Sequence, residues 1–310
     1  MPNLAIEICG IRLKNPVLAS SGAFGYGLEF ASILDLNALG GFVVKGLSRE
    51  PIAGNPEPRL VETSSGMLNS IGLQNVGVRA FVAEKLPALA RLETAVFANV
   101  FGYQPEDYVE VLRVLEDAEG LAGYELNVSC PNTKHGGLQF GADASLLSEV
   151  VGMAKKAATR RPLIVKLSPN VSSIAAMARA AAEAGADAIS LVNTFVGLAV
   201  DVRTRRPLLG AGFGGLSGPA IKPIALRMVY EVAQAVRIPV IGLGGIATGE
   251  DVAEYLVCGA SATQVGTATF WDPRSPLRLI EEFRHFLEAE RIASAADLIG
   301  TLQMNKRNPA

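Results

Sequence analysis

Short apolar runs alternate with longer amphipathic stretches along almost the whole length of this chain, and this pattern restricts the folds open to it. Each apolar run ends in a polar residue or a glycine. The eight runs cover residues 16–21, 41–45, 94–99, 123–127, 163–166, 188–193, 239–244 and 262–266. Short runs that alternate with helical segments are typical of parallel strands joined by helical crossovers.

The stretches between the runs predict the helices of such a fold, at residues 78–91, 105–117, 145–159, 172–184, 219–236 and 251–258. Eight strand–helix units in 310 residues fit an α/β fold of the (β/α)8 TIM barrel type, with inserted loops at its C-terminal face. Residues 5–8 and 11–14 flank Cys9-Gly10 and predict an N-terminal β-hairpin beneath the barrel. Because no linker or shift in composition interrupts the pattern, residues 1–310 are predicted to form a single domain.

Charge and cysteine content exclude several classes of protein. The 28 Lys and Arg residues against 30 Asp and Glu residues give a net charge of −2, without the basic excess of a nucleic-acid binder. No apolar run approaches about 20 residues and no secretory signal is visible, so we expect a cytoplasmic protein that does not enter membranes. Three distant cysteines and two histidines predict no disulfide framework, no iron–sulfur cluster held by this chain alone and no metal site. Any demanding chemistry would then belong to a bound organic cofactor.

The residues at the strand ends indicate a ligand site, because TIM barrels bind ligands at the C-terminal ends of their strands. These residues are Ser21, Lys45, Gly46, Asn99, Asn127, Lys166, Asn193, Thr194, Gly244, Gly245, Gly266 and Thr267. Taken singly, each lysine or asparagine is more often a solvated or capping residue. Taken together at one end of a barrel, they predict a pocket for a polar, anionic ligand.

The glycines after the last two strands indicate a phosphate site. TIM barrels frequently bind phosphate at the loops after strands seven and eight, through backbone N–H groups and a helix N-terminus. Glycine lets the phosphate approach the backbone closely, and a helix is predicted to begin near Thr248. Gly210, Gly212 and Gly215 also match a dinucleotide-binding pattern, but no strand–turn–helix context surrounds them, so a flexible loop is predicted there.

Cys130 is the candidate for direct chemistry. It follows a predicted strand and lies in a loop shaped by Pro131 and several glycines, whereas Cys9 and Cys258 are interpreted as small buried hydrophobic residues. An ordinary thiol, of pKa about 8.5, is roughly a tenth ionised near pH 7.5, which is enough for a general base if the site lowers that pKa. His135 leaves a Cys/His nucleophile open as an alternative.

Four motifs, in order along the chain, resemble class 1 dihydroorotate dehydrogenases. They lie at residues 69–75, 127–132, 215–219 and 242–246, and the resemblance covers essentially the whole chain. It implies an FMN at the top of the barrel and the oxidation of dihydroorotate to orotate in pyrimidine biosynthesis. The cysteine at position 130 is typical of class 1, since class 2 enzymes use serine and carry an N-terminal helical extension.

The resemblance also implies roles for individual residues. Cys130 would remove a proton from C5 of the substrate while hydride passes from C6 to N5 of FMN, under a loop at residues 129–141 that acts as a lid. The substrate would be held by Lys45, Asn69, Ser70, Ile71, Gly72, Leu73, Asn127, Asn132, Asn193 and Thr194. The flavin would be lined by Ser21, Lys45, Gly46, Asn99, Asn127, Lys166, Val192 and Gly218, with Gly244, Gly245, Gly266 and Thr267 at its phosphate. Lys166 would stabilise negative charge on the reduced ring.

Residues 67–71, 193–195 and 202–207 resemble class 1B, the NAD-linked form. This implies a homodimer of barrels that joins a partner subunit carrying FAD and a [2Fe–2S] cluster to form a heterotetramer. Ala23 departs from the threonine that family members often carry. The alternatives are class 1A, which uses fumarate, and dihydropyrimidine dehydrogenase. More distant alternatives are a phosphosugar lyase or isomerase with a Schiff-base lysine and a non-catalytic binding barrel.

Overall fold

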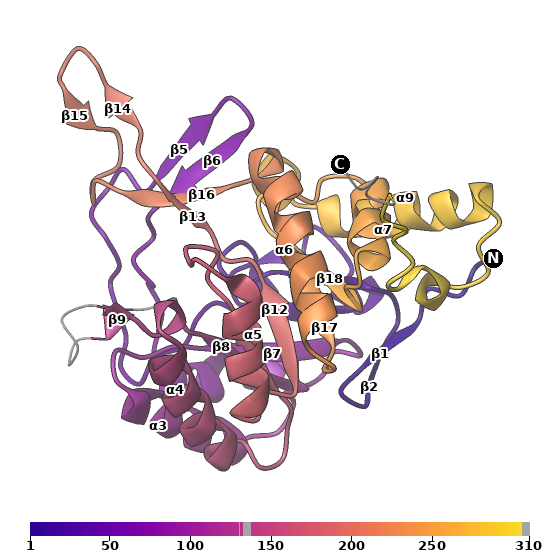
Figure 1. Ribbon diagram of the computed structural model, residues 1–310. Coiled ribbons are helices and arrows are strands. Elements are labelled where there is room, and N and C mark those ends of the chain that lie inside the picture. The colour runs from indigo at the N-terminus through magenta and orange to yellow at the C-terminus, as the bar shows by residue number, and fades with distance from the viewer. Residues whose placement is uncertain (130, 133–137, 306–310) are drawn as a thin grey trace.

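The fold is a closed barrel of eight parallel strands (Figure 1). The structure, a computed structural model, describes residues 1–129, 131–132 and 138–305. The barrel strands are β3 (Val17–Ala19), β4 (Gly41–Val43), β7 (Ala95–Val100), β8 (Gly123–Asn127), β11 (Leu163–Lys166), β12 (Ala188–Leu191), β17 (Val240–Leu243) and β18 (Ala262–Val265), in this order around the barrel. Every one overlaps a run predicted from the sequence, so the predicted TIM barrel is confirmed.

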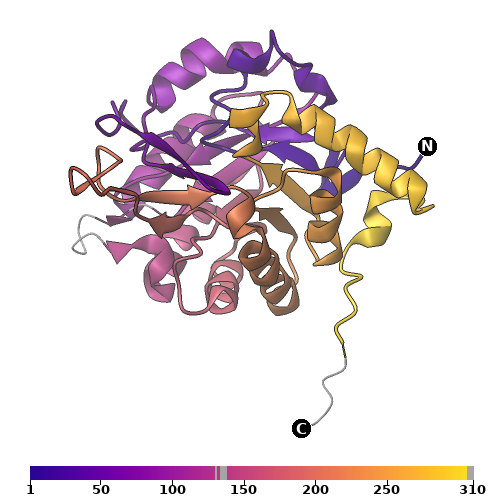
Figure 2. The ribbon, with the colours of Figure 1, turned by 90° about the horizontal axis from the view of Figure 1, so that it is seen from above.

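Helices cover the outside of the barrel. They are α1 (Val78–Ala80) continuing through a π-helical segment (Phe81–Lys85) into α2 (Leu86–Leu89), then α3 (Pro105–Glu116), α4 (Ala144–Ala157), α5 (Ile174–Glu183), α6 (Lys222–Ala235), α7 (Gly249–Val257), α8 (Ala268–Trp271) and α9 (Ser275–Ala289). α9 is absent from the helices predicted from the sequence, although Leu279, Ile280, Phe283 and Leu287 give it a buried face with helical spacing. Figure 2 shows α9, in yellow, on the outside of the barrel near the N-terminus.

The N-terminal hairpin is formed by β1 (Ile6–Ile8) and β2 (Ile11–Leu13). Cys9 and Gly10 join the strands with φ angles of 52° and 77°, as a tight two-residue turn between antiparallel strands requires. The Cys9 Sγ donates a hydrogen bond to the carbonyl of Asp187, 3.3 Å away and just before β12. The hairpin therefore lies at the N-terminal end of the barrel, as predicted.

Two of the long connections, which were predicted only as loops, form one sheet. Its strands are β5 (Leu60–Thr63) and β6 (Gly66–Asn69), which follow β4, and β13 (Phe195–Gly197) and β16 (Gly214–Ser217), which follow β12. They pair antiparallel in the order β13-β16-β6-β5, and we call them the roof sheet. The flexible loop predicted at residues 210–215 is wrong for Gly214 and Gly215, which lie in β16. A Cβ on Gly215 would lie 2.0 Å from the Thr194 Oγ1, so this glycine permits close packing.

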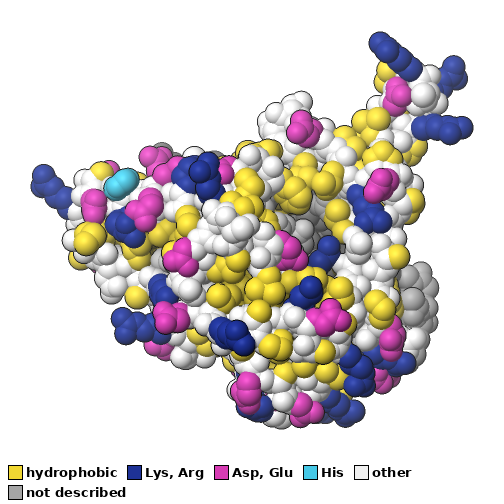
Figure 3. Space-filling view, turned by 180° about the vertical axis from the view of Figure 1, so that it is seen from behind, with side chains coloured by type: hydrophobic (Ala, Val, Ile, Leu, Met, Phe, Trp, Pro, Cys, Tyr) yellow, Lys and Arg dark blue, Asp and Glu magenta, His cyan; other side chains and the backbone are white. Residues whose placement is uncertain are grey.

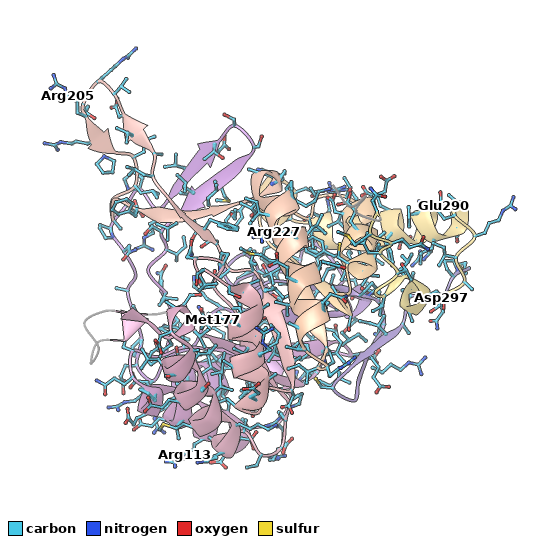
Figure 4. All side chains as sticks on the ribbon, viewed as in Figure 1. Arg113, Met177, Arg205, Arg227, Glu290 and Asp297 are labelled. Carbon is cyan, nitrogen blue, oxygen red and sulfur yellow. The ribbon has the colours of Figure 1, made fainter. Side chains whose placement is uncertain are left out.

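The connection between β13 and β16 extends into an arm that projects from the barrel. At its end, β14 (Val200–Asp201) pairs with β15 (Arg206–Pro207). Figure 3 shows basic side chains gathered at the end of the arm, and Arg205 points away from the body of the protein there (Figure 4). The short elements that remain are β9 (Pro131–Asn132) paired with β10 (Leu138–Gln139), and 3-10 turns at Leu28–Phe30, Leu36–Ala38, Phe140–Ala142, Pro219–Ile221 and Ala295–Leu298. No helix within the described part of the chain is long and apolar enough to cross a bilayer.

Candidate active site

A cavity of about 570 Å³ lies between the C-terminal ends of the barrel strands and the roof sheet. This volume falls in the roughly 300–1,000 Å³ range of small-molecule sites. The barrel contributes residues at the ends of its strands, such as Asn99 and Lys166, and the roof sheet contributes Met67, Asn69 and Ser217. A ligand in this cavity would be enclosed from below by the barrel and from above by the roof sheet.

The structure brings together the site residues predicted from the sequence. Those that line the cavity are Ser21, Lys45, Gly46, Asn69, Ser70, Ile71, Gly72, Leu73, Asn99, Asn127, Lys166, Val192, Asn193, Thr194, Gly218, Gly244, Gly245, Gly266 and Thr267. Cys130 lies outside the described residues, as do residues 133–137 of the predicted lid, and the side chain of Asn132 is not described either. The roles assigned to these residues stay predictions.

Positive φ angles mark the end of the cavity where phosphate binding was predicted. Gly218, Gly244 and Gly245 have φ angles of 98°, 136° and 73°. A Cβ on Gly245 would lie 2.7 Å from the carbonyl oxygen of Gly218, so the two backbone segments approach as closely as glycine allows. Bare backbone that faces a cavity in this way suits a phosphate group.

The helix that follows β17 does not offer its first amides to a phosphate. The backbone N–H groups of Ala247 and Thr248 donate to the Asp251 carboxylate at 2.7 and 2.8 Å, and that of Gly249 donates to Glu282 at 2.9 Å. Asp251 belongs to a capping box with Thr248. A helix N-terminus was predicted to contribute to the phosphate site, but these carboxylates already occupy the N-terminus of α7.

Amide side chains from the ends of two strands form a hydrogen-bonded group in the cavity wall. The Asn193 Nδ2 donates to the Asn127 Oδ1 at 3.3 Å and to the Ser129 Oγ at 2.9 Å, while the Asn193 Oδ1 accepts from the Thr194 amide at 2.8 Å. Lys45 also lines the cavity and is half-buried, and burial lowers its pKa, with Arg59 acting in the same direction and Glu29 opposing it. Fixed amides and a desolvated cation are the groups that recognise a small, polar anion.

A buried carboxylate that the sequence analysis missed lies beneath the cavity. Glu125, in β8, is fully buried. It accepts hydrogen bonds from Ser21 (3.3 Å), Asn99 (2.8 Å), Lys166 (3.4 Å), Ser190 (2.9 Å) and Gln264 (2.8 Å). Burial by itself would raise the pKa of Glu125, but the Lys166 ammonium and the hydrogen bonds outweigh it and hold that pKa below its ordinary value. The signal in the sequence was a glutamate inside an otherwise apolar strand.

Gln264, in β18, carries a buried side-chain acceptor whose hydrogen-bonding capacity the described residues do not use. Its Nε2 donates to Glu125, while its Oε1 is buried and has no hydrogen-bond partner among the described residues. Gln264 also lines the cavity. A buried polar atom without a partner is costly, so a ligand with an N–H or O–H group would stabilise this arrangement.

Comparison with known proteins connects this geometry to a family. The family profile described as dihydroorotate dehydrogenase matches residues 3–287. The chain belongs to the dihydroorotate dehydrogenase family. This family uses FMN and acts in pyrimidine biosynthesis, in agreement with the class 1 resemblance, and membership in it argues against the phosphosugar lyase alternative.

Relatives of this chain are named as two different classes of dihydroorotate dehydrogenase. A protein of Solibacter usitatus named as a dihydroorotate dehydrogenase A (fumarate) is 73% identical, over 97% of this chain and 99% of its own length. Proteins of Citrifermentans bemidjiense and Geotalea uraniireducens are 52% and 53% identical, over 98% and 97% of this chain and 99% and 98% of their own lengths. Both are named as the catalytic subunit of dihydroorotate dehydrogenase B (NAD(+)).

Proposed function

We propose that this chain binds FMN in the cavity and oxidises dihydroorotate to orotate. The observation that carries the proposal is that the cavity collects all the predicted substrate and flavin residues whose side chains the structure describes. Its lining suits this pair of ligands. Bare glycine backbone at Gly244 and Gly245 suits a monophosphate, whereas the amides of Asn127 and Asn193, together with Lys45, suit a pyrimidine with a carboxylate.

Different residues of the chain have different roles in the reaction. The Cys130 thiolate takes the proton from C5 of dihydroorotate, and the C6 hydrogen leaves as hydride, so that two electrons and two hydrogens depart in all and a C5–C6 double bond forms. Bound FMN supplies the acceptor for that hydride. Lys45 and the asparagines orient the substrate, and Lys166 stabilises the negative charge that reduction places on the flavin ring.

The purified protein is expected to contain FMN and no FAD. The glycine backbone at residues 244–245 and 266 fits a terminal phosphate, and Gln264 presents an acceptor that a flavin N–H or a ribityl hydroxyl could satisfy. Heat release of the cofactor followed by chromatography against FMN and FAD standards is the measurement. Recovery of FAD, or of no flavin, would contradict the proposal.

For the electron acceptor, we propose NAD, reached through a partner subunit that carries FAD and a [2Fe–2S] cluster and docks on a homodimer of this chain. The support is the class 1B resemblance of residues 67–71, 193–195 and 202–207, together with the relatives named as NAD-linked catalytic subunits. Three cysteines cannot supply the four ligands that such a cluster usually requires. The chain alone should therefore pass electrons to NAD poorly.

The isolated chain is expected to reduce an artificial dye with dihydroorotate while reducing NAD only slowly, and co-expression with an FAD/iron–sulfur subunit should restore NAD reduction. Steady-state assays with dye, NAD and fumarate as alternative acceptors provide the measurement. Rapid NAD reduction by the isolated chain would contradict the need for a partner.

Fumarate is the second candidate acceptor, and the name of the 73% identical relative favours it. The same assay separates the two candidates, because fumarate needs no second protein. Brisk turnover of dihydroorotate with fumarate by the isolated chain would assign it to class 1A.

A further inference from the structure

Glu125 is a fully buried carboxylate beneath the cavity that none of the steps described above uses. It lies in β8, two residues before Asn127. Ser21, Asn99 and Lys166, which are three of its five hydrogen-bond donors, are also residues predicted to line the flavin. Glu125 therefore connects several parts of the flavin site from below.

A carboxylate can only accept hydrogen bonds, and this determines how its neighbours face the cavity. Gln264 must turn its Nε2 toward the Glu125 Oε2, which leaves its Oε1 as an acceptor for a ligand. The Lys166 side chain is only 6% exposed, and among the described residues Glu125 is its sole ion-pair partner, at 3.4 Å. One carboxylate thus sets the orientation of an acceptor and the position of a cation.

We propose that Glu125 is a positioning residue for the flavin, which holds the Lys166 ammonium and the Gln264 acceptor toward the cofactor and so raises the midpoint potential of bound FMN. The inference rests on the proposed function. A cation held close to the flavin stabilises the negative charge that reduction places there. A buried ammonium without a counter-ion is unfavourable, so without the charge of Glu125 the Lys166 side chain would turn away from this position toward water. The cavity would then lose its cation.

The test is the midpoint potential of bound FMN in Glu125→Gln, Lys166→Met and the double variant, measured by equilibration with a reference dye. We expect E125Q to shift the equilibrium at least about tenfold toward oxidised FMN, which corresponds to a potential about 30 mV lower for a two-electron couple. The double variant should match E125Q within about twofold, because Lys166 no longer contributes once Glu125 is neutral. An unchanged or raised potential in E125Q, or a further tenfold fall in the double variant, would overturn the inference.

Glu116 offers a matched control, since it is a second buried glutamate with several hydrogen bonds but does not line the cavity. Its carboxylate accepts from the Tyr124 hydroxyl at 2.8 Å and from the Thr159 hydroxyl and the Arg160 amide, each at 2.9 Å. Glu116→Gln should lower the resistance to denaturant and leave the FMN potential at the wild-type value. A potential that falls in E116Q as far as in E125Q would show that general loosening of the barrel, and not positioning, causes the shift.

Stability without flavin gives a second readout. Removing both members of a buried ion pair is less disruptive than removing one. The apo form of E125Q/K166M should therefore unfold at a higher denaturant concentration than apo K166M, and the reverse order would overturn the pairing.

If E125Q does not fold, the double variant replaces it in the measurement of the FMN potential. A potential below that of the wild type would then support the inference, and a wild-type potential would refute it. Wild-type protein that takes up no FMN would overturn the proposed function and this inference together. If the wild type binds FMN and the FMN potential of E125Q equals that of the wild type, only the inference is overturned.

Discussion

Replacing Cys130 with alanine is expected to slow the reduction of bound FMN by dihydroorotate about 10²–10⁴-fold, the usual contribution of a positioned general base. The FMN content should stay near that of the wild type, because the residues predicted to hold the flavin are others. Rapid mixing of the oxidised enzyme with dihydroorotate, followed by the loss of flavin absorbance, measures this step without any external acceptor.

The other two cysteines serve as matched controls for this prediction. Burial raises the pKa of Cys9 to about 11, with Asp187 adding to the effect and Lys155 opposing it. Burial also raises the pKa of Cys258, at the end of α7, with Glu254 adding to it. Both stay thiols at neutral pH and neither lines the cavity, so Cys9→Ala and Cys258→Ala should reduce flavin at nearly the wild-type rate. Wild-type rates in the Cys130 variant would remove the thiolate from the mechanism.

The second large effect is expected from Gly245→Ala, which should weaken FMN binding by more than about 100-fold. Alanine is strained at a φ of 73°, and its Cβ would lie 2.7 Å from the Gly218 carbonyl oxygen and 3.0 Å from the Lys222 amide nitrogen. The backbone must therefore move away from the phosphate. A hydrogen bond to a charged group contributes about 1.5–3 kcal/mol, so the loss of one or two accounts for this effect. Titration of apoprotein with FMN, followed by flavin fluorescence, measures the dissociation constant.

Gly212→Ala separates the effect of backbone strain from the effect of the shape of the phosphate site. Gly212 has a similar φ of 85°, but no atom lies within 4 Å of the position of an added Cβ, and the residue does not line the cavity. The variant should lose about 1–2 kcal/mol of stability and keep its affinity for FMN. Equal loss of FMN in both variants would mean that backbone strain anywhere in the chain, and not the shape of the phosphate site, weakens binding.

The barrel could be predicted from the sequence because its pattern is local. The run at residues 163–166 is apolar over its first three residues, since both faces of a barrel strand are buried, and it ends at Lys166, where the strand meets the cavity. The strand-end residues could be assigned to one site for the same reason, because parallel strands of a closed barrel all end on one face.

The roof sheet and Glu125 depend on contacts that no local pattern contains. Asn69 of β6 pairs with Gly215 of β16, 146 positions along the chain, and β5 alternates between exposed and half-buried residues without a core of its own. The donors to Glu125 come from β7, β11, β12, β18 and the residues after β3, so only closure of the barrel brings them to one carboxylate. Glu125 lies in the middle of β8, so a search for polar residues at strand ends does not find it.

The pairing of β6 with β16 also limits how this protein can diversify. TIM barrels commonly acquire new activities by exchanging one loop after one strand while the scaffold stays the same. Here the insertions after β4 and β12 are halves of a single hydrogen-bonded sheet. A graft or deletion of either one leaves the other with unpaired backbone over the ligand. The two insertions must therefore be kept or exchanged together, in evolution and in engineering, although more than a hundred residues separate them in the chain.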